Sequence, residues 1–210
     1  MKNSMLAVVR IRRVLASAIA LVFISSGWGW AASGQDKAGH DQPYALLKAG
    51  DQAPPLNFKS LSGVPAPTWE SLRGQVVILD FWATWCAPCI KAIPELNELV
   101  RRYQGHPVQF FSVTYEKEQT VTPFLKKYPL RSQVVLDSTC SMFRSYKAWG
   151  IPMVAVVGGD GKIKSVVHPP QLTSELIDKV LSGRAPQVEQ ATPYKDPKGA
   201  EDYFCKEASQ

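Results

Sequence analysis

Two of the four cysteines, Cys86 and Cys89, are separated by two residues, which is the spacing of a redox-active dithiol. At this spacing a first thiolate attacks a disulfide, and a second thiol one helical turn later resolves the mixed disulfide. Cys86 comes first and follows Trp85. We therefore expect Cys86 to be the exposed, attacking thiol, with its pKa lowered from about 8.5 toward roughly 7. Cys89 is then the resolving thiol, and Pro88 suits the first turn of a helix.

A Cys-x-x-Cys pair also occurs in metal and haem sites. A four-cysteine zinc site needs a second close pair, but Cys140 and Cys205 lie far apart in the sequence and no histidine follows at ligand spacing. Attachment of a c-type haem needs histidine at the position of Ile90. We therefore expect a dithiol with no metal and no cofactor. The alternative function is that of a copper-binding protein, in which the two thiols bind copper and Met153 is a thioether ligand.

A strand and a helix must bring these thiols into position. Residues 76–79 form an uninterrupted apolar run, typical of a buried strand. After Cys89, apolar residues recur at three- and four-residue spacing with charged residues between them, which predicts an amphipathic helix. These apolar positions are Ile90, Ile93, Leu96, Leu99, Val100 and Tyr103. The dithiol therefore lies at a helix N-terminus, where unpaired N–H groups stabilise a thiolate.

The run of residues 80–89, Asp-Phe-Trp-Ala-Thr-Trp-Cys-Ala-Pro-Cys, resembles the active site of thioredoxins. Pro94 matches the helix-kinking proline of that family, and Gly150-Ile151-Pro152 matches a second, distant family motif. The resemblance covers roughly residues 49–183. More narrowly, the chain is similar to the exported TlpA-like thioredoxins, which include the cytochrome-c-biogenesis reductases. The resemblance implies a thioredoxin-like α/β fold with a mixed central sheet, helices on both faces and an extra strand–helix insertion.

Three further parts of the site follow from the residues and from this resemblance. Asp80 lies within the apolar strand, where burial should raise the pKa of its carboxyl group. The resemblance implies that Asp80 accepts the proton of Cys89, whereas a carboxylate that reaches solvent at the strand end is the alternative. The resemblance also implies that the Ile151–Pro152 peptide bond is cis and that the Ile151 backbone pairs with a substrate chain like an added strand. Trp85 is expected to rim the site.

The resemblance implies a protein disulfide oxidoreductase that acts on disulfide-containing substrate proteins. We expect it to be a reductant, recharged by a membrane thiol donor. An oxidising or isomerising member of the same family is the alternative, because the intervening residues Ala87 and Pro88 do not determine the reduction potential. A peroxidase would need proline and threonine upstream of its reactive cysteine, where Leu79 and Ala83 stand.

The N-terminal stretch has the features of an export signal. Residues 1–32 carry four Lys and Arg and no acid, so only +2 of the net charge of +6 belongs to the rest of the chain, and nucleic acid is not an expected partner. An uncharged run, residues 14–25, follows the basic residues, and small residues at 29 and 31 suit a cleavage site. Residues 14–32 are also near the ~20 needed to span a bilayer, so an uncleaved membrane anchor is the alternative. Either way, we expect a periplasmic or other extracytoplasmic location.

Composition and periodicity divide the chain into four parts. We expect a signal peptide or membrane anchor at 1–31, a linker at 32–48, the thioredoxin-like domain at 49–185 and a polar C-terminal tail at 186–210. Within the domain, further strands are expected at 108–113, 134–136, 153–157 and 162–167, and further helices at 120–128, 142–149 and 172–181.

Cys140 and Cys205 are not explained by the family motif. If Cys86 and Cys89 form one pair, elimination leaves a Cys140–Cys205 bridge, which would pin the tail to the domain. In an oxidising compartment we expect this bridge to be structural. A second exchange pair, with Cys140 activated at a helix start, and a Cys205–Cys205 bond between two chains are the alternatives.

Overall fold

The computed structural model of the protein describes residues 47–186, Ala191 and Cys205. In chain order its elements are β1 (Lys59–Ser60), β2 (Val76–Phe81), α1 (Ala87–Arg102), β3 (Val108–Thr114), α2 (Glu118–Lys127), β4 (Gln133–Leu136), α3 (Ser141–Ser145), β5 (Met153–Val157), β6 (Ile163–Val167), the 3-10 helix η1 (Pro169–Gln171) and α4 (Ser174–Leu181). The predicted signal or anchor and most of the predicted linker lie outside the described residues. Among the helices that are described, none combines the length and apolar character needed to cross a bilayer.

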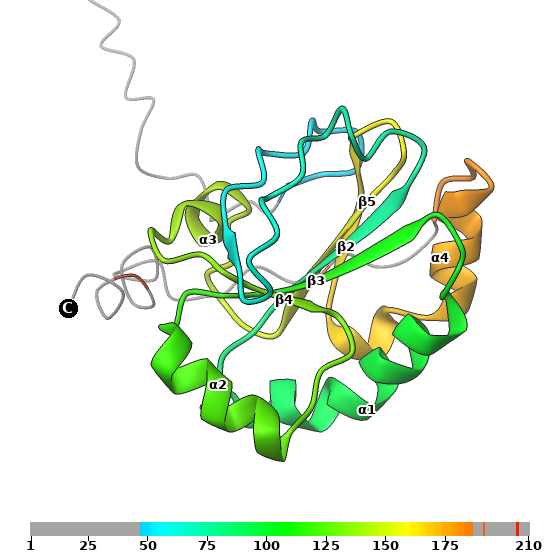
Figure 1. Cartoon of the computed structure of the whole chain (residues 1–210). Helices are drawn as coiled ribbons and strands as arrows, with labels where there is room; N and C mark the ends of the chain where they lie inside the picture. Colours follow the sequence, from blue (N-terminus) through cyan, green and yellow to red (C-terminus); the bar gives the residue numbers. More distant parts are fainter. Residues whose placement is uncertain (1–46, 187–190, 192–204, 206–210) are drawn as a thin grey trace, which may run out of the picture. The chain divides into compact units, whose positions relative to one another are not determined.

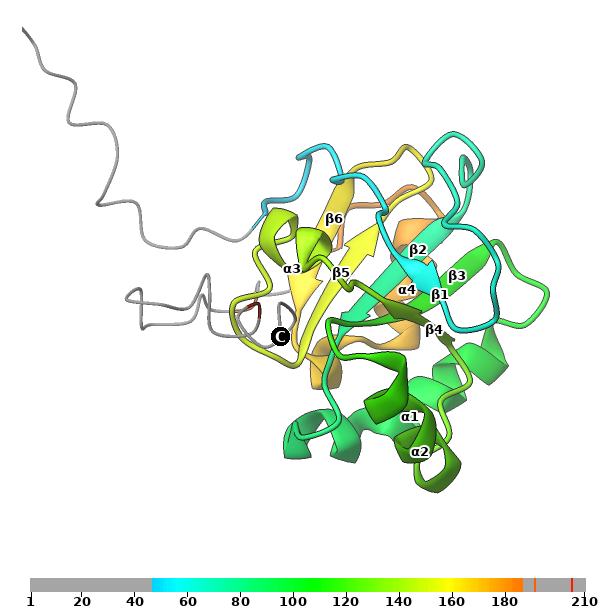
Figure 2. The ribbon, with the colours of Figure 1, turned by 60° about the vertical axis from the view of Figure 1, so that its left-hand side comes forward.

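The six strands form one mixed sheet in the order β1-β4-β3-β2-β5-β6. β2, β3 and β4 run parallel, whereas β1, β5 and β6 are each antiparallel to the strands beside them. Figure 2 shows β5 and β6 next to β2, with β1 and β4 toward the other side of the sheet. Every residue of β2 is buried, because this strand is central and covered on both faces. The mixed sheet confirms the predicted fold class.

Helices cover both faces of the sheet, as predicted (Figure 1). Successive residues of β2 point to opposite faces, so Ile78 packs with α1 and α4, whereas Leu79 packs on the side of α3. Leu96 of α1 and Leu176 of α4 belong to the first of these two core clusters, and Phe143 of α3 belongs to the second. The helix α2 lies beside α1 in both ribbon views.

The helix before β5 is shorter than its apolar pattern predicts. The expected helix at 142–149 ends at Ser145, because Lys147 adopts a left-handed backbone conformation with a φ of 56°. The N–H of Ala148 then closes the turn on the carbonyl of Phe143 at 2.9 Å. Tyr146 and Ala148 remain fully buried, so the apolar pattern correctly marked core positions although it did not mark the helix end.

Two residues of the predicted C-terminal tail are part of the core. Ala191 and Cys205 are both buried and belong to the cluster on the α3 side of the sheet. The backbone N–H of Ala191 donates a hydrogen bond to the carbonyl of Val166 in β6 at 2.8 Å. Ala191 and Cys205 therefore contact the domain, although the polar composition of the predicted tail favours a solvated segment.

Candidate active site

Five segments that carry the candidate site lie at the same end of the sheet, which is the edge formed by the carboxyl ends of the parallel strands. β2, β3 and β4 run parallel, so residues 82–86, 115–117 and 137–140 follow strand ends on one side. β5 is antiparallel to β2 and begins there, opposite Phe81, and β6 ends there. Residues 151–152 and His168 therefore belong to the same edge. Ligands of open α/β sheets bind at this edge, beyond the carboxyl ends of the parallel strands.

Cys86 is the N-cap residue of α1, and Cys86 and Cys89 are joined by a disulfide. The N–H of Cys89 donates to Cys86 Sγ at 3.2 Å, so an N-terminal donor of the helix points at this sulfur. A thiolate at this position is stabilised by that donor and by the helix dipole. In the disulfide form Cys86 is 3% exposed and Cys89 is 6% exposed. The prediction that Cys86 is the more exposed of the two cysteines therefore does not hold for this form. The exposed neighbour is Trp85, at 52%.

Asp80 is buried in the fifth position of β2. Burial raises the pKa of Asp80 from 3.8 to about 7, and a hydrogen bond from Ser112 Oγ, at 3.3 Å, partly opposes this shift. Ser112 in turn shares a 2.6 Å hydrogen bond with Ser132. Asp80 therefore titrates near neutral pH, where it is able to exchange a proton with a neighbouring group.

A small pocket connects Asp80 with the second cysteine. Its volume is about 20 Å³, which is room for about one water molecule. It is lined by Asp80, Trp82, Cys89, Ala92, Ile93, Glu95, Leu96, Leu99, Leu130, Val154, Pro169 and Leu172. Apart from the Asp80 and Glu95 carboxyl groups, most of this lining is apolar, and the Cys89 sulfur lies in it together with Asp80. The structure thus brings together two residues that sequence analysis had paired.

The buried carboxyl predicts that the oxidised protein loses stability as the pH rises from about 4 to about 7. The folded chain keeps the Asp80 proton in this range, whereas the unfolded chain releases it. The contribution of the Asp80 proton to the free energy of unfolding is complete below about pH 4 and is lost above about pH 7. We expect a loss of roughly 2 to 3 kcal/mol between pH 5 and pH 8, and Asp80→Asn should remove it. Urea unfolding at both pH values measures this. Equal pH dependence in the two proteins would contradict it.

Trp85 is held at the rim of the site by a residue for which no role was predicted. Trp85 Nε1 donates to the hydroxyl group of Tyr115 at 2.8 Å. The Tyr115 ring is buried and meets Phe143 of α3 edge-on, with ring centroids 5.3 Å apart. Phe143 also meets Phe81 of β2 edge-on, at 5.2 Å. The exposed indole is therefore oriented through a chain of aromatic contacts that reaches α3.

Glu116 is a second site residue that sequence reasoning missed. Its carboxylate accepts hydrogen bonds from the N–H and the hydroxyl group of Thr84, at 2.6 and 2.7 Å. Thr114 also donates to it, at 3.2 Å. These bonds hold the loop that precedes the dithiol against the end of β3. An acid two residues after a buried strand is the only sequence signal for this role, and that signal is weak.

The Ile151–Pro152 peptide bond is cis, as the resemblance implies. Ile151 is partly buried against the core, and no backbone hydrogen bond joins it to another residue in the described part of the chain. Nδ1 of His168 lies 3.0 Å from the Pro152 carbonyl oxygen. This contact places His168, a residue without a predicted role, beside the expected docking segment.

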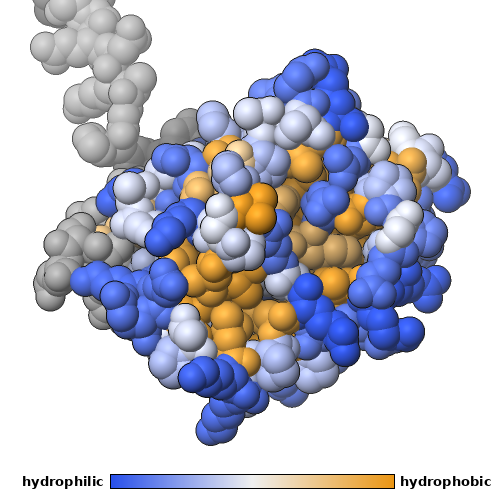
Figure 3. Space-filling view, viewed as in Figure 1, coloured by the Kyte–Doolittle hydropathy of each residue, from blue (hydrophilic) through white to orange (hydrophobic). Residues whose placement is uncertain are grey.

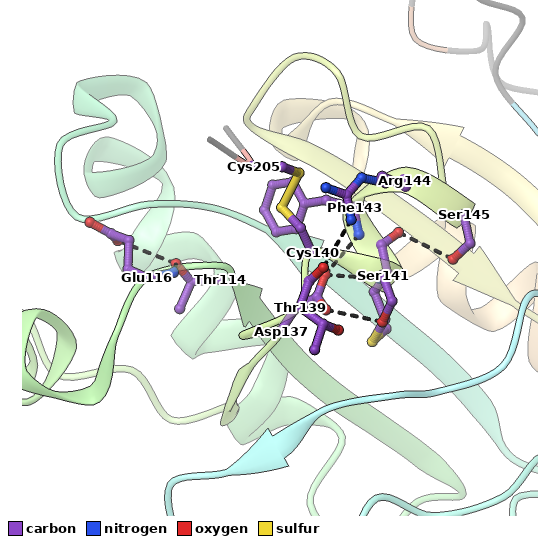
Figure 4. The surroundings of a disulfide bond; sticks show 11 residues. Thr114, Glu116, Asp137, Thr139, Cys140, Ser141, Phe143, Arg144, Ser145 and Cys205 are labelled. Atoms are coloured by element: carbon purple, nitrogen blue, oxygen red, sulfur yellow. Dashed lines mark hydrogen bonds between the residues drawn. A yellow bond between two sulfur atoms is a disulfide. The ribbon is translucent and has the colours of Figure 1, made fainter. Parts of the chain in front are cut away.

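Cys140 and Cys205 are also joined by a disulfide, with their Cα atoms 5.6 Å apart (Figure 4). Both cysteines are buried. Cys140 precedes α3 with a left-handed φ of 57°, and Asp137 caps this helix by accepting from the N–H groups of Met142 and Phe143, each at 2.9 Å. Burial raises the pKa of Asp137 to about 6, although these hydrogen bonds oppose the shift. Figure 4 shows the bridge lying against the ring of Phe143.

The described residues contain no cluster of three or more His, Cys, Asp and Glu side chains arranged to hold a metal ion. In the space-filling view, apolar side chains gather at the surface around β4 and α2, beside α1 (Figure 3). Leu61, which follows β1, is partly buried and packs against the core, as do Phe124 and Leu125 of α2.

Several proteins with similar sequences or structures are named as enzymes of thiol–disulfide exchange. Residues 49–166 match the AhpC/TSA family. The thiol-disulfide oxidoreductase ResA of Bacillus cereus is 30% identical over 62% of this chain and 75% of its own length. The ResA protein of Oceanobacillus iheyensis is also 30% identical, over 68% of this chain and 76% of its own.

A solved structure of a thiol:disulfide interchange protein is also similar to this chain. The chain is similar to the crystal structure of a putative thiol:disulfide interchange protein DsbE from Chlorobium tepidum, with a TM-score of 0.57 and 27% identity. The similarity covers 65% of this chain and 97% of the other. Together with the dithiol at the N-terminus of α1, these similarities confirm the resemblance to TlpA-like thioredoxins. The chain belongs to the AhpC/TSA family and is a thioredoxin-like protein disulfide oxidoreductase.

Proposed function

We propose that this protein reduces disulfides in substrate proteins outside the cytoplasm. The observation that carries the proposal is that Asp80 and Cys89 line one small pocket behind the active-site disulfide. A carboxyl group with a pKa near 7 is suited to take a proton from a thiol at neutral pH. Cys86, at the helix N-terminus, is suited to be the attacking thiolate.

In this reaction the reduced dithiol gives two electrons to a substrate disulfide. The Cys86 thiolate attacks one substrate sulfur, which breaks the substrate S–S bond and releases the other sulfur as a thiolate that takes a proton from solvent. Cys89 then gives its proton to the Asp80 carboxylate, and its sulfur attacks Cys86 Sγ in the mixed disulfide. The second substrate thiolate leaves and is protonated. The enzyme ends with the Cys86–Cys89 disulfide, the form described here.

The substrate chain docks on residues 151–152 and against Trp85. The Ile151 backbone lies at the edge of the sheet where the dithiol loop begins, which suits addition of an extended substrate segment. Trp85 offers an exposed apolar surface beside Cys86. Both features support a protein substrate rather than a small disulfide.

Each turnover leaves an oxidised dithiol, so a reductase outside the cytoplasm needs a thiol donor. We propose a membrane protein with a reduced dithiol, because the N-terminal stretch directs the chain to the membrane or across it. If the signal is cleaved after Ala31, N-terminal sequencing of the exported protein should begin at Ala32. An intact N-terminus in the membrane fraction would instead show a tether.

The reduction potential of Cys86–Cys89 tests the direction of electron flow. A reductase should have a potential near that of thioredoxin, about −270 mV, whereas an oxidant should lie nearer to about −120 mV. Equilibration of the full chain with glutathione redox buffers measures this value. A strongly oxidising potential would contradict the reducing direction and leave the oxidoreductase assignment intact.

Asp80→Asn should slow insulin reduction by about 10- to 100-fold near pH 7, because an amide of the same shape cannot take the Cys89 proton. Ser112→Ala is a matched control: it removes the hydrogen bond to Asp80 but leaves the carboxyl group. Reduction rates of Asp80→Asn that equal those of the parent from pH 6 to pH 9 would rule out this role for the carboxyl group.

A further inference from the structure

We propose that the Cys140–Cys205 disulfide also shapes the surface on which substrate chains dock, because a series of contacts links it to the exposed ring of Trp85. The inference rests on the proposed function, since Trp85 is part of the proposed docking surface. It assigns no electron transfer to this second disulfide. The bridge acts as a positioning element, through Phe143 and Tyr115.

The first link fixes the indole ring of Trp85. An indole N–H only donates, and Trp85 Nε1 donates to the hydroxyl group of Tyr115 at 2.8 Å. Tyr115 is 3% exposed, whereas Trp85 is 52% exposed. The indole is therefore held at its polar atom by a residue of the core, while much of its apolar surface is open to a substrate chain.

The backbone beside this ring is held separately. The Glu116 carboxylate accepts from the N–H and the hydroxyl group of Thr84, and the N–H of Cys86 donates to the carbonyl of Ala83 at 3.1 Å. These bonds close the turn that leads into Cys86 without using the Trp85 side chain. A movement of the indole therefore leaves the attacking sulfur in place, so docking and chemistry can be separated by experiment.

The second link joins Tyr115 to α3. The Phe143 ring is fully buried and meets the rings of Tyr115 and Phe81 edge-on, with centroids 5.3 and 5.2 Å apart and an interplanar angle of 90° in both pairs. The strength of such contacts depends on the relative orientation of the rings. A shift of Phe143 therefore changes the support of the Tyr115 ring.

The third link is the bridge itself. Figure 4 shows the bridge against the ring of Phe143, and both cysteines belong to the same core cluster as that ring. Cys140 has a left-handed φ of 57°, and its carbonyl accepts a backbone bond of α3 from Arg144 at 3.1 Å. A residue with a side chain keeps such a backbone conformation only where its surroundings impose it. Without the bond to Cys205, Cys140 is freer to leave this conformation and to move the start of α3.

Loss of the bridge should weaken docking rather than chemistry. An indole that is free to turn loses more conformational entropy when a substrate chain orders it. We expect the double variant Cys140→Ser/Cys205→Ser to raise the KM for insulin by about 3- to 10-fold, the range of a single hydrogen bond. The kcat and the rate with a small disulfide such as hydroxyethyl disulfide should stay close to those of the parent.

Three further variants test the route of this effect. Tyr115→Phe removes only the hydroxyl group and should raise the KM to a similar extent with the bridge intact. Phe143→Leu also keeps the bridge but removes the edge-on contact with Tyr115, so its KM should rise too. Adding Tyr115→Phe to the double cysteine variant should raise the KM no further, because both changes act through the same ring.

Leu176→Ala is the matched control for a loss of stability. Leu176 is buried in the other core cluster, on the side of α1 and α4, so its truncation destabilises the fold away from this series of contacts. At a temperature at which all the variants are folded, it should leave the KM unchanged.

A spectroscopic measurement tests the link without turnover. The indole N–H signal of Trp85 in a proton–nitrogen NMR spectrum of the full chain, assigned with Trp85→Phe, reports its hydrogen bond to Tyr115. In the double cysteine variant this signal should shift toward its position in Tyr115→Phe.

An unchanged Trp85 signal in the double cysteine variant would overturn the proposal. A parent-like KM in that variant or in Phe143→Leu would do the same, as would KM effects of Tyr115→Phe and the cysteine changes that multiply. An equal rise in Leu176→Ala would also overturn it, because general destabilisation would then account for the effect.

Failure of the proposed function gives a different pattern. A parent-like KM in Trp85→Ala would contradict the docking surface itself, whereas a raised KM in Trp85→Ala beside a parent-like double cysteine variant contradicts only the link. If the parent protein oxidises a reduced protein dithiol instead of reducing insulin, the direction is wrong. The same KM comparison, made with the reduced protein as substrate, then decides the role of the bridge.

Discussion

Cys86→Ser is expected to lower insulin reduction by about a thousand-fold or more, because it removes the sulfur that attacks the substrate. The serine hydroxyl is a far weaker nucleophile at neutral pH than a thiolate stabilised at a helix N-terminus. Cys89→Ser should also stop turnover, but at a later step. Its Cys86 still attacks, and no second thiol is present to release the substrate.

The two variants should therefore differ in whether they accumulate a covalent complex with substrate proteins. Cys89→Ser should accumulate mixed disulfides with substrate proteins, visible as a reducible shift on a denaturing gel, and Cys86→Ser should not. Alkylation at pH 6 after mild reduction should label Cys86 first. The reverse pattern, with adducts on Cys89 in Cys86→Ser, would exchange the roles of the two cysteines and separate Asp80 from the resolving step.

Cys205→Ser is expected to lower the free energy of unfolding by about 4 kcal/mol, the chain-entropy estimate for a closed loop of this length. For a domain of this size the shift in Tm should be about 10 °C. The loss should be large because the bridge joins Cys140, at the start of α3, to a segment far away in sequence. Thermal unfolding of the oxidised full chain measures the effect.

The double variant Cys140→Ser/Cys205→Ser is the control. Both cysteines take part in one bond, so the double variant should be no less stable than either single variant. Peptide mapping without reductant should recover a peptide pair that contains both cysteines. Free thiols at both positions, a Cys205–Cys205 dimer, or an unchanged Tm in Cys205→Ser would contradict a structural bridge. A bridge that opens as readily as Cys86–Cys89 would be a second redox pair.

The central part of the fold could be predicted because its patterns are local. The apolar run at 76–79 and the helical spacing after Cys89 placed β2 and α1 within a few residues. Ten consecutive residues then placed the dithiol between them. Asp80 was also predictable, because a charged residue inside a buried strand requires an explanation wherever it occurs.

The missed residues depend on contacts between segments that are far apart in the sequence. Glu116 bonds Thr84 across 32 positions, and His168 reaches Pro152 across 16. Neither residue type is unusual on a loop, so only the strand order reveals the contact. The end of α3 was missed for a different reason. The apolar pattern continues past Lys147, whose left-handed backbone ends the helix, and no glycine stands there to mark the end.

The hydrogen bond from Ala191 to Val166 has a consequence for solubility. β6 pairs only with β5 among the described strands, so it is the last strand on that side of the sheet and its outward backbone groups need other partners. Those of Ile163 bond Gly50 and Asp51. Exposed strand edges are templates for pairing with another chain, and proteins avoid aggregation by covering them. Ala191 occupies one of these groups, and Cys205, further along the same segment, is bonded to Cys140. The second disulfide thus ties a residue beyond Ala191 to the domain and helps to keep Ala191 at this strand edge, which counters self-association.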